Sequence, residues 1–224
     1  MGKKNYQDVL EAVKELLCQD DFLHTQRVLN YALQILETES KANPEAVILS
    51  AILHDIGRAK NGTGFLSSGS HAETGAEKSR EILAGKEYPE EVIQLVAECI
   101  LTHSNKSEAK PQTLEAQILF DADKLDMTGA VGVARAIQAA ADGKPFYQVD
   151  EDGFPLKGKK KESPSLFQDY QQKLDKTSTL FYTDKARKMA IKRQKIMDDY
   201  FSNLHNEIDK NHENGMKLLH RYCK

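Results

Sequence analysis

An apolar run that leads directly into a histidine and an aspartate constrains the fold of this chain more than any other sequence feature. Residues 50–58 read Ser-Ala-Ile-Leu-His-Asp-Ile-Gly-Arg. A helix with the composition of a core helix therefore ends by carrying His54 and Asp55 into the interior. Burial of an unpaired carboxylate costs on the order of several kcal/mol, so this pair requires a cation or a polar partner. Taken alone, the pair is also explained by a histidine that closes a helix beside a salt-bridged aspartate.

Composition favours a domain built from packed helices. Of the 224 residues, 40% are hydrophobic and 7% aromatic, with no Trp, which suits cores made of Leu, Ile, Val and Ala. The length fits one domain over residues 1–224 that carries an insertion. The three cysteines are scattered, no apolar run could cross a bilayer, and no secretion signal is recognised, so we expect a cytoplasmic protein without membrane contact.

Apolar residues recur at helical spacing, and strand alternation persists nowhere in the chain. We therefore expect an all-α fold with a core over about residues 21–142, a lysine-rich loop at 143–165 and further helices at 166–210. Capping residues or prolines mark the expected helix starts at Pro44, His71, Pro89, Leu114 and Asp184. Two further helices are expected to begin near Asp21 and at Thr128. On this pattern His24 lies on an apolar helix face, His71 opens a helix, and His103 closes one.

The C-terminal half carries a long helix and a positively charged segment. The expected apolar stripe of the helix is Ala186, Met189, Ile196, Tyr200, Leu204 and Ile208. We expect the polar tail 211–224 to be frayed and the last three histidines to lie at the surface: His205, His212 and His220. Residues 143–195 contain thirteen Lys or Arg and seven Asp or Glu. This segment, with its lysines at 157 and 159–161, either closes over an anionic ligand or is solvated chain.

Histidines and aspartates from consecutive helices indicate a shared site: His24, His54, His71, His103, Asp55, Asp121 and Asp123. One histidine on an apolar face is usually a satisfied core residue, but four in one domain are harder to explain that way. Imidazole and carboxylate donors without thiolates suit Mn, Mg, Fe, Ni, Co or Zn in a catalytic site. Asp121 and Asp123 point about 200° apart on a helix, so only one can reach the metal. The apolar stripe of that helix slightly favours Asp121, and helix geometry does not choose between them.

The order of these residues resembles a known family. His24, then His54-Asp55, then Ala122-Asp123-Lys124-Leu125 resembles the H…HD…D pattern of the HD-domain metal-dependent phosphohydrolases. The C-terminal Thr-Asp-Lys-Ala-Arg-Lys-Met-Ala is similar to a bacterial subgroup that contains nucleoside triphosphate pyrophosphohydrolases. The resemblance covers about residues 21–208. It implies a helical HD-domain bundle in which the metal is held by four side chains: His24, His54, Asp55 and Asp123. Asp121 is then expected to support the ligands.

The resemblance leaves the number of metals open. His71 and His103 occupy positions where binuclear members hold a second metal and where mononuclear members contact phosphate or the attacking water. We prefer one metal, because the subgroup resemblance points there, and Mn is the first choice among the possible ions. We expect Asp55 and these two histidines to be the catalytic groups. The cations expected to neutralise phosphate, or to form surface ion pairs, are Arg27, Arg58 and Lys124.

The predicted activity is hydrolysis of (deoxy)nucleoside triphosphates to monophosphate and pyrophosphate, with a small nucleotide as partner and no nucleic acid. A 5′-nucleotidase or a cyclic-nucleotide phosphodiesterase would use the same site. Two other classes stay open: a binuclear iron oxygenase, and a non-catalytic ligand-sensing module whose C-terminal helix forms an output or homodimer surface. The chain has no Walker A loop, no Gly-x-Gly-x-x-Gly and no Gly-x-Ser-x-Gly, so kinase, dinucleotide-binding and serine-hydrolase assignments have no support.

Overall fold

The computed structural model describes residues 6–58, 71–104, 109–140, 145–154, 156, 165–169 and 180–223. In these ranges the regular structure consists of helices and contains no β-strand, which confirms the all-α prediction. Contacts between Cα atoms divide the chain into two compact units: Met1–Asp126 with Phe181–Arg187, and Met127–Leu180 with Lys188–Lys224. The lysines at 157 and 159–161 lie outside the described residues, and the single domain expected over 1–224 stays a prediction.

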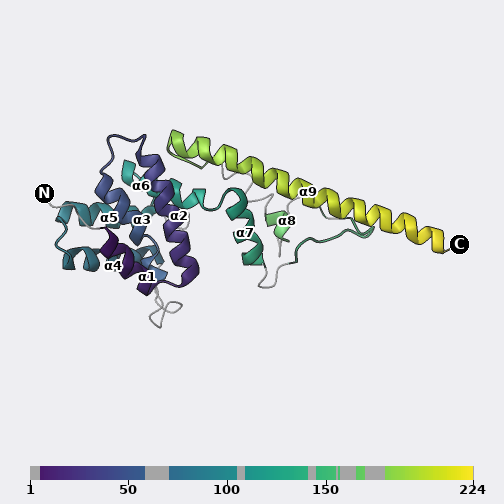
Figure 1. Cartoon of the computed structure of the whole chain (residues 1–224), viewed down its shortest axis with the longest axis horizontal. Coiled ribbons are helices and arrows are strands. Elements are labelled where there is room, and N and C mark those ends of the chain that lie inside the picture. The colour runs from purple at the N-terminus through teal and green to yellow at the C-terminus, as the bar shows by residue number, and fades with distance from the viewer. Residues whose placement is uncertain are drawn as a thin grey trace. The chain divides into compact units, whose positions relative to one another are not determined.

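The first unit is built from the helices that the sequence places before residue 126. They are α1 (Gln7–Leu16), α2 (Gln19–Leu36), α3 (Pro44–Leu53), the 3₁₀ turn η1 (Ile56–Arg58), α4 (His71–Gly85), α5 (Glu90–Thr102) and α6 (Leu114–Leu125) (Figure 1). Two predicted caps are confirmed: the side chain of Asn43 accepts the N–H groups of Glu45 and Ala46, and that of Thr113 accepts the N–H of Ala116. Side-chain caps satisfy backbone donors that a helix start leaves unpaired.

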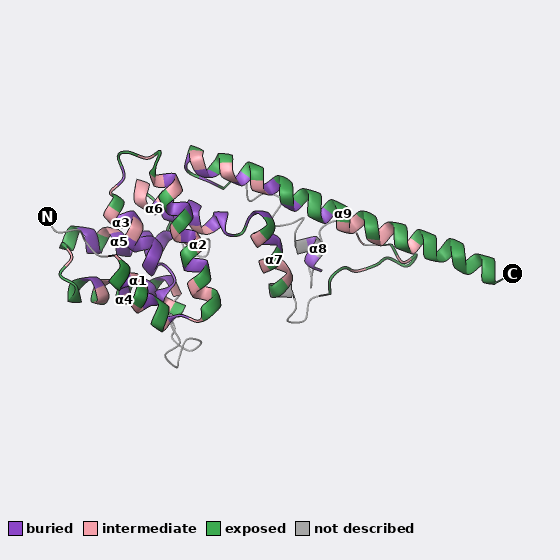
Figure 2. Cartoon of the chain, in the orientation of Figure 1, coloured by how far each residue is buried: buried purple, intermediate pink, exposed green. Residues whose placement is uncertain are grey.

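Helix α3 lies at the centre of the first unit. It packs against α1, α2, α5 and α6, and its residues from Ala46 to Leu53 are buried apart from the half-buried Ile48. Figure 2 shows how buried residues gather in this part of the chain. A helix that is apolar on all sides must be enclosed by other helices. Because α3 ends at Leu53, His54 and Asp55 fall in the buried turn that follows it.

Gly57 allows η1 to approach the start of α4. A Cβ atom at this position would collide with the backbone carbonyl oxygen of His71, so any larger residue would push the two elements apart. The close approach brings the first residue of α4 next to the turn that carries His54 and Asp55. A local feature of the sequence, one glycine after the His-Asp pair, thus sets the position of a third histidine.

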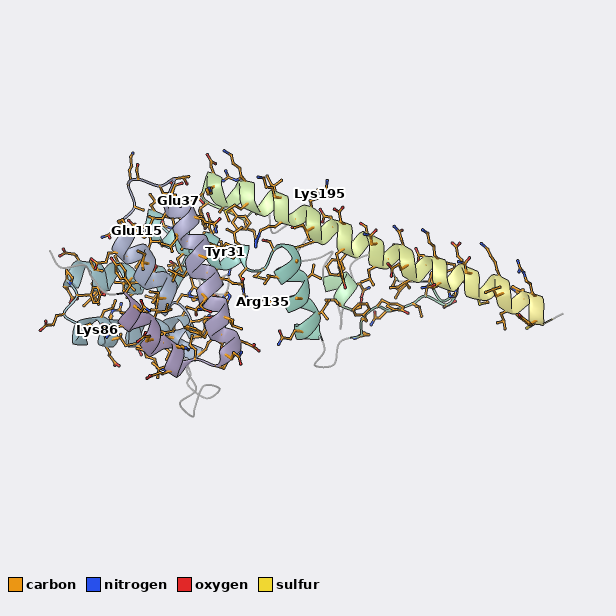
Figure 3. The ribbon with its side chains drawn as sticks, in the orientation of Figure 1. Tyr31, Glu37, Lys86, Glu115, Arg135 and Lys195 are labelled. Atoms are coloured by element: carbon orange, nitrogen blue, oxygen red, sulfur yellow. The ribbon has the colours of Figure 1, made fainter. Side chains whose placement is uncertain are left out.

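The second unit contains α7 (Gly129–Ala140), α8 (Leu166–Asp169) and the greater part of α9 (Asp184–Tyr222). Its buried cluster consists of Val133, Leu166, Met197 and Phe201. The apolar stripe predicted for α9 is therefore wrong at two positions, because Ile196 is 49% exposed and Tyr200 38% exposed. The residues of α9 that pack against α7 and α8 are Met197 and Phe201, each one position after the residue that was predicted. Lys195, labelled in Figure 3, lies on the exposed side.

The fraying expected for residues 211–224 is also wrong, because α9 continues to Tyr222. The ring of His212 packs edge-on against Phe154, with centroids 4.5 Å apart. An ion pair between Glu213 and Lys217 adds i, i+4 support to the last turns. His205 is half-buried, with its Nε2 atom 3.1 Å from Oδ2 of Asp209, and is not the surface residue that we expected.

Two further features concern the cysteines and the helices. Cys18, Cys99 and Cys223 are free thiols. Within the described ranges, no helix is both long enough and apolar enough to cross a membrane.

Candidate metal centre

The first group of ligand atoms comes from α2 and from the turn after α3. The Nε2 atoms of His24 and His54 lie 3.3 Å apart. They lie 3.7 and 3.6 Å, respectively, from Oδ2 of Asp55. All three side chains are buried. These three donor atoms lie within 4.8 Å of one another, which is close enough for one cation to contact all of them.

The other ring nitrogen of each histidine is already engaged. His54 Nδ1 donates to the carbonyl of Ala51 at 2.9 Å, and His24 Nδ1 donates to Oδ2 of Asp126 at 2.7 Å. A carbonyl can only accept, so the ring proton of His54 belongs on Nδ1 and its Nε2 lone pair points toward His24. Burial lowers the pKa of His54, which keeps this ring neutral. Two imidazole nitrogens that face each other beside a carboxylate fit a bound cation, and held Nδ1 atoms are typical of metal-ligating histidines.

Asp123, and not Asp121, lies beside this first group. Its Oδ1 is 3.1 Å from His24 Nε2, and its Oδ2 is 2.6 Å from the ammonium of Lys124. Burial favours a raised pKa for Asp123, but the His24 bond and the charge of Lys124 outweigh it and hold the pKa well below its usual range. Asp123 is therefore ionised and directs one oxygen at the histidine pair.

Asp121 forms its hydrogen bonds elsewhere in the first unit, with residues at the start of α9. Its buried carboxylate accepts the N–H of Tyr182 at 2.9 Å and both the N–H and the hydroxyl of Thr183 at 2.7 Å. The side chain of Thr183 in turn caps α9 by accepting the N–H of Ala186. Burial is the largest influence on Asp121 and raises its pKa. This carboxylate thus fixes the residue that begins α9.

Asp126 is the residue of the candidate centre that the sequence reasoning missed. It is fully buried, holds His24 Nδ1, and also accepts two bonds from Arg27: Nε to Oδ1 at 2.6 Å and Nη2 to Oδ2 at 3.0 Å. These hydrogen bonds raise the pKa of Arg27. Asp126 therefore fills the supporting role that we expected of Asp121. Its position three residues after Asp123, on the same side of the helix end, is the signal that could have identified it.

The carboxylate of Asp55 is shared between the first group and a second one. Its Oδ1 lies 3.9 Å from the Nε2 atoms of both His71 and His103, and these three donors form the second group that could hold a cation. Burial favours a raised pKa for Asp55, but His54 and Arg58 outweigh it and lower the pKa to about 2. Asp55 is therefore ionised throughout the physiological range.

The two histidines of the second group are neutral bases. Burial lowers the pKa of both His71 and His103, and for His71 the charge of Arg58 adds to the effect. His103 Nδ1 donates to the carbonyl of Ile100 at 2.6 Å, which directs Nε2 toward Asp55. The side chain of His71 is 26% exposed and that of His103 only 3%. His71 is thus the one that a solvent-borne ligand could reach.

The three predicted phosphate-binding cations all pair with carboxylates of the centre. Arg27 contacts Asp126, Arg58 donates its Nε to Asp55 Oδ1 at 2.8 Å, and Lys124 contacts Asp123. Their side chains are 33%, 48% and 7% exposed, respectively. The two arginines are therefore partly open to solvent, whereas Lys124 is buried, with its ammonium 5.2 Å from the centre of the Phe120 ring.

Comparison with known proteins identifies relatives over this region. Residues 21–128 match the model of the HD domain family. The Bacillus subtilis protein YpgQ is 28% identical to this chain over 189 residues, which is 84% of each protein. An uncharacterized protein of Clostridium beijerinckii is 36% identical over 112 residues, which is 48% of this chain and 65% of that protein.

Solved structures share the fold. The crystal structure of Bacillus subtilis YpgQ is 27% identical, covers 91% of this chain and 95% of its own, and has a TM-score of 0.71. A structure of YpgQ in complex with ADP has a TM-score of 0.70 at 26% identity, with 91% and 94% covered. A predicted HD superfamily hydrolase from an uncultured Thermotogales bacterium has a TM-score of 0.63 at 26% identity, with 91% and 92% covered. Over residues 21–128 this chain is therefore similar to the HD domain family, and its helical fold and the order of its clustered His and Asp side chains agree with that similarity.

Proposed function

We propose that this chain is a metal-dependent phosphohydrolase that converts (deoxy)nucleoside triphosphates to the monophosphate and pyrophosphate. The observation that carries the proposal is the convergence of His24, His54 and Asp55 on one point, with arginine side chains beside it. Hydrolysis of phosphate esters requires a Lewis acid and cations for the phosphate charge, and this arrangement offers both. The ADP complex of YpgQ supports a nucleotide as the substrate class.

The metal would be held by His24, His54, Asp55 and Asp123. When bound, a divalent cation supplies Lewis acidity for a phosphoryl oxygen and for the attacking water. Other side chains of the chain support these four residues. Asp126 orients His24, and Lys124 keeps Asp123 ionised. Mn is our first choice of metal because carboxylate oxygens, which suit Mn, supply half of this set.

The two remaining histidines are proposed to move protons. His71 and His103 are neutral and turn Nε2 toward Asp55, so either can accept a proton from water held at the centre. His71 is the stronger candidate for contact with substrate because it is half-buried at the first residue of α4. Free N–H groups at a helix start favour phosphate as a neighbour.

Arg27 and Arg58 are proposed to bind the phosphate groups of the substrate. Each has one part of its guanidinium fixed by a carboxylate, which places the remaining N–H donors without further loss of side-chain freedom. Lys124 is proposed to contribute charge through Asp123, given its burial.

The test is a product analysis with separate readouts for pyrophosphate and orthophosphate. Metal-stripped protein is incubated with Mn and with nucleoside triphosphates, monophosphates or cyclic nucleotides. We expect pyrophosphate from triphosphates, a loss of at least 100-fold in His54→Ala, and wild-type rates in His220→Ala, which removes an exposed histidine of α9. Orthophosphate from monophosphates would assign a nucleotidase instead. Absence of turnover with every nucleotide, in protein that binds Mn, would refute the proposal.

A further inference from the structure

The two groups of histidines share a single carboxylate, and each of its oxygens faces one group. Oδ2 of Asp55 is turned to His24 and His54, at 3.7 and 3.6 Å. Oδ1 is turned to the second group, 3.9 Å from both imidazole nitrogens. The first group has a further carboxylate oxygen from Asp123. Among the described residues, the second group has Oδ1 of Asp55 as its only clustered anionic donor.

Arg58 already occupies that oxygen. Its Nε atom donates to Oδ1 of Asp55 at 2.8 Å, well inside the 3.9 Å that separates Oδ1 from the two histidines. The backbone supports this contact, because the N–H of Arg58 donates to the carbonyl of Asp55 at 2.9 Å in the turn that includes η1. A guanidinium in a protein does not lose its proton, so the positive charge next to Oδ1 is permanent.

Lys124 makes the matching contact at the other carboxylate. Its ammonium lies 2.6 Å from Oδ2 of Asp123, and Oδ1 of the same carboxylate stays directed at His24. Both carboxylates therefore give one oxygen to a basic side chain and the other to the first group. The first group combines two imidazoles with two anionic oxygens, whereas the second combines two imidazoles with one anionic oxygen that already accepts a hydrogen bond from Arg58. The positive charge of Arg58 next to that oxygen weakens the attraction of a dication to the second group relative to the first.

We propose that Arg58 closes the second group to metal, so that the chain binds one divalent cation and His71 and His103 stay free of metal. Arg58 acts here as a positioning residue through Asp55. The inference rests on the proposed function only in taking a divalent cation as the ligand of the first group. It explains how a chain with two ligand groups can hold one metal, and it leaves the second pair of histidines available for proton transfer.

The test is a count of bound Mn in the full-length chain. Metal-stripped protein is saturated with Mn and desalted, and bound Mn is measured by elemental analysis and by electron paramagnetic resonance. We expect one Mn per wild-type chain. Arg58→Met, which keeps a long unbranched side chain but removes the guanidinium, is expected to bind two, with the spectrum of a coupled pair. The matched control Lys124→Met removes the cation from the other carboxylate and is expected to stay at one.

A histidine variant gives an independent measurement. His103→Ala is expected to leave the count at one in the wild-type background and to lower it from two to one in Arg58→Met. Two Mn in the wild type, or one Mn in a folded Arg58→Met, overturns the inference. If Arg58→Met does not fold, His103→Ala decides alone, since loss of a Mn from the wild type would place metal on the second group. Counting needs no substrate, so a chain that binds one Mn without nucleotide turnover refutes the proposed function and not this inference.

Discussion

At the scale of residues, the centre is organised by carboxylates that each serve two partners. Asp55 joins the two histidine groups, Asp123 joins His24 to Lys124, and Asp126 joins His24 to Arg27. A buried carboxylate with a basic partner stays ionised at low cost, because hydrogen bonds replace the water that it loses. This pairing keeps three negative charges inside the first unit.

The role of Asp126 predicts a loss of metal affinity without a direct contact to metal. Asp126→Asn retains the shape of the side chain but no longer fixes the proton on His24 Nδ1 as firmly, so we expect Mn affinity to fall about 10- to 100-fold. Isothermal titration of metal-stripped protein measures the change. Asp121→Asn, a buried carboxylate on the same helix with no bond to a ligand, is the matched control and is expected to change Mn affinity less than threefold. Equal losses in the two variants would contradict the assignment.

The lowered pKa values predict how the metal-free protein responds to acid. His54, His71 and His103 all have a pKa below the ordinary 6.5. They bind protons more weakly in the folded chain than in the unfolded one, so their contribution to stability is complete above about pH 6.5 and is lost as the pH falls below it. We expect the thermal midpoint to drop between about pH 7.5 and pH 5.5, and to drop less in His103→Asn. A thermal midpoint that rises as the pH falls would contradict this prediction.

At the scale of elements, short connections position the ligands. The turn after α3 places His54 and Asp55, and the approach of η1 to α4 places His71. Helices α2 and α6 pack side by side and bring His24 to Asp123 and Asp126. Rigid helices joined by tight turns hold such groups within the narrow tolerance that metal binding and catalysis require.

A substitution at Gly57 tests whether η1 and α4 must lie close together. Gly57→Ala puts a methyl group against the carbonyl of His71, so we expect a loss of about 1–3 kcal/mol in the free energy of unfolding, as for other overpacked sites. Gly85→Ala is the matched control, because a Cβ at residue 85 meets no atom within 4 Å. Urea denaturation of both variants measures the difference. Similar stabilities for the two would mean that η1 and α4 can separate freely.

At the scale of the whole molecule, side chains of the candidate centre that are far apart in the chain link the helices of the first unit. His24 and Asp126 are 102 residues apart in sequence, and Asp55, which lies between them in sequence, comes from the turn after α3. A cation that binds only the folded arrangement stabilises it by mass action. The candidate centre would thus also cross-link the helices of the first unit when a cation is bound.

Metal removal is accordingly expected to lower thermal stability. With Mn at about 100 times its dissociation constant, the folded state should gain roughly 2.7 kcal/mol, and the gain should vanish on chelation. His54→Ala is expected to remove the effect of Mn, whereas His205→Ala, in the second unit, is expected to retain it. Differential scanning calorimetry with and without Mn measures this. A wild-type midpoint that does not respond to Mn would argue against a metal centre.

Much of this architecture follows from local sequence. The caps at Asn43 and Thr113 and the apolar run of α3 depend on neighbours within a few residues, and helix periodicity exposes them. The same local signals predicted the helical fold. The choice of Asp123 over Asp121 came from the family resemblance, because the apolar stripe of the helix slightly favoured Asp121. Where periodicity was ambiguous, prediction failed: the buried face of α9 includes Met197 and Phe201 rather than Ile196 and Tyr200, because packing against α7 and α8 selects the face.

The tertiary structure alone decided which carboxylate serves which partner. Asp121, Asp123 and Asp126 are close in sequence and similar in chemistry, yet they face Thr183, His24 with Lys124, and His24 with Arg27. The sequence likewise does not show that the carboxylate of Asp55 contacts Arg58 and both histidine groups. Hydrogen-bond partners across helices depend on how those helices pack, and a pattern along one chain segment carries no information about the residues that another segment brings opposite it.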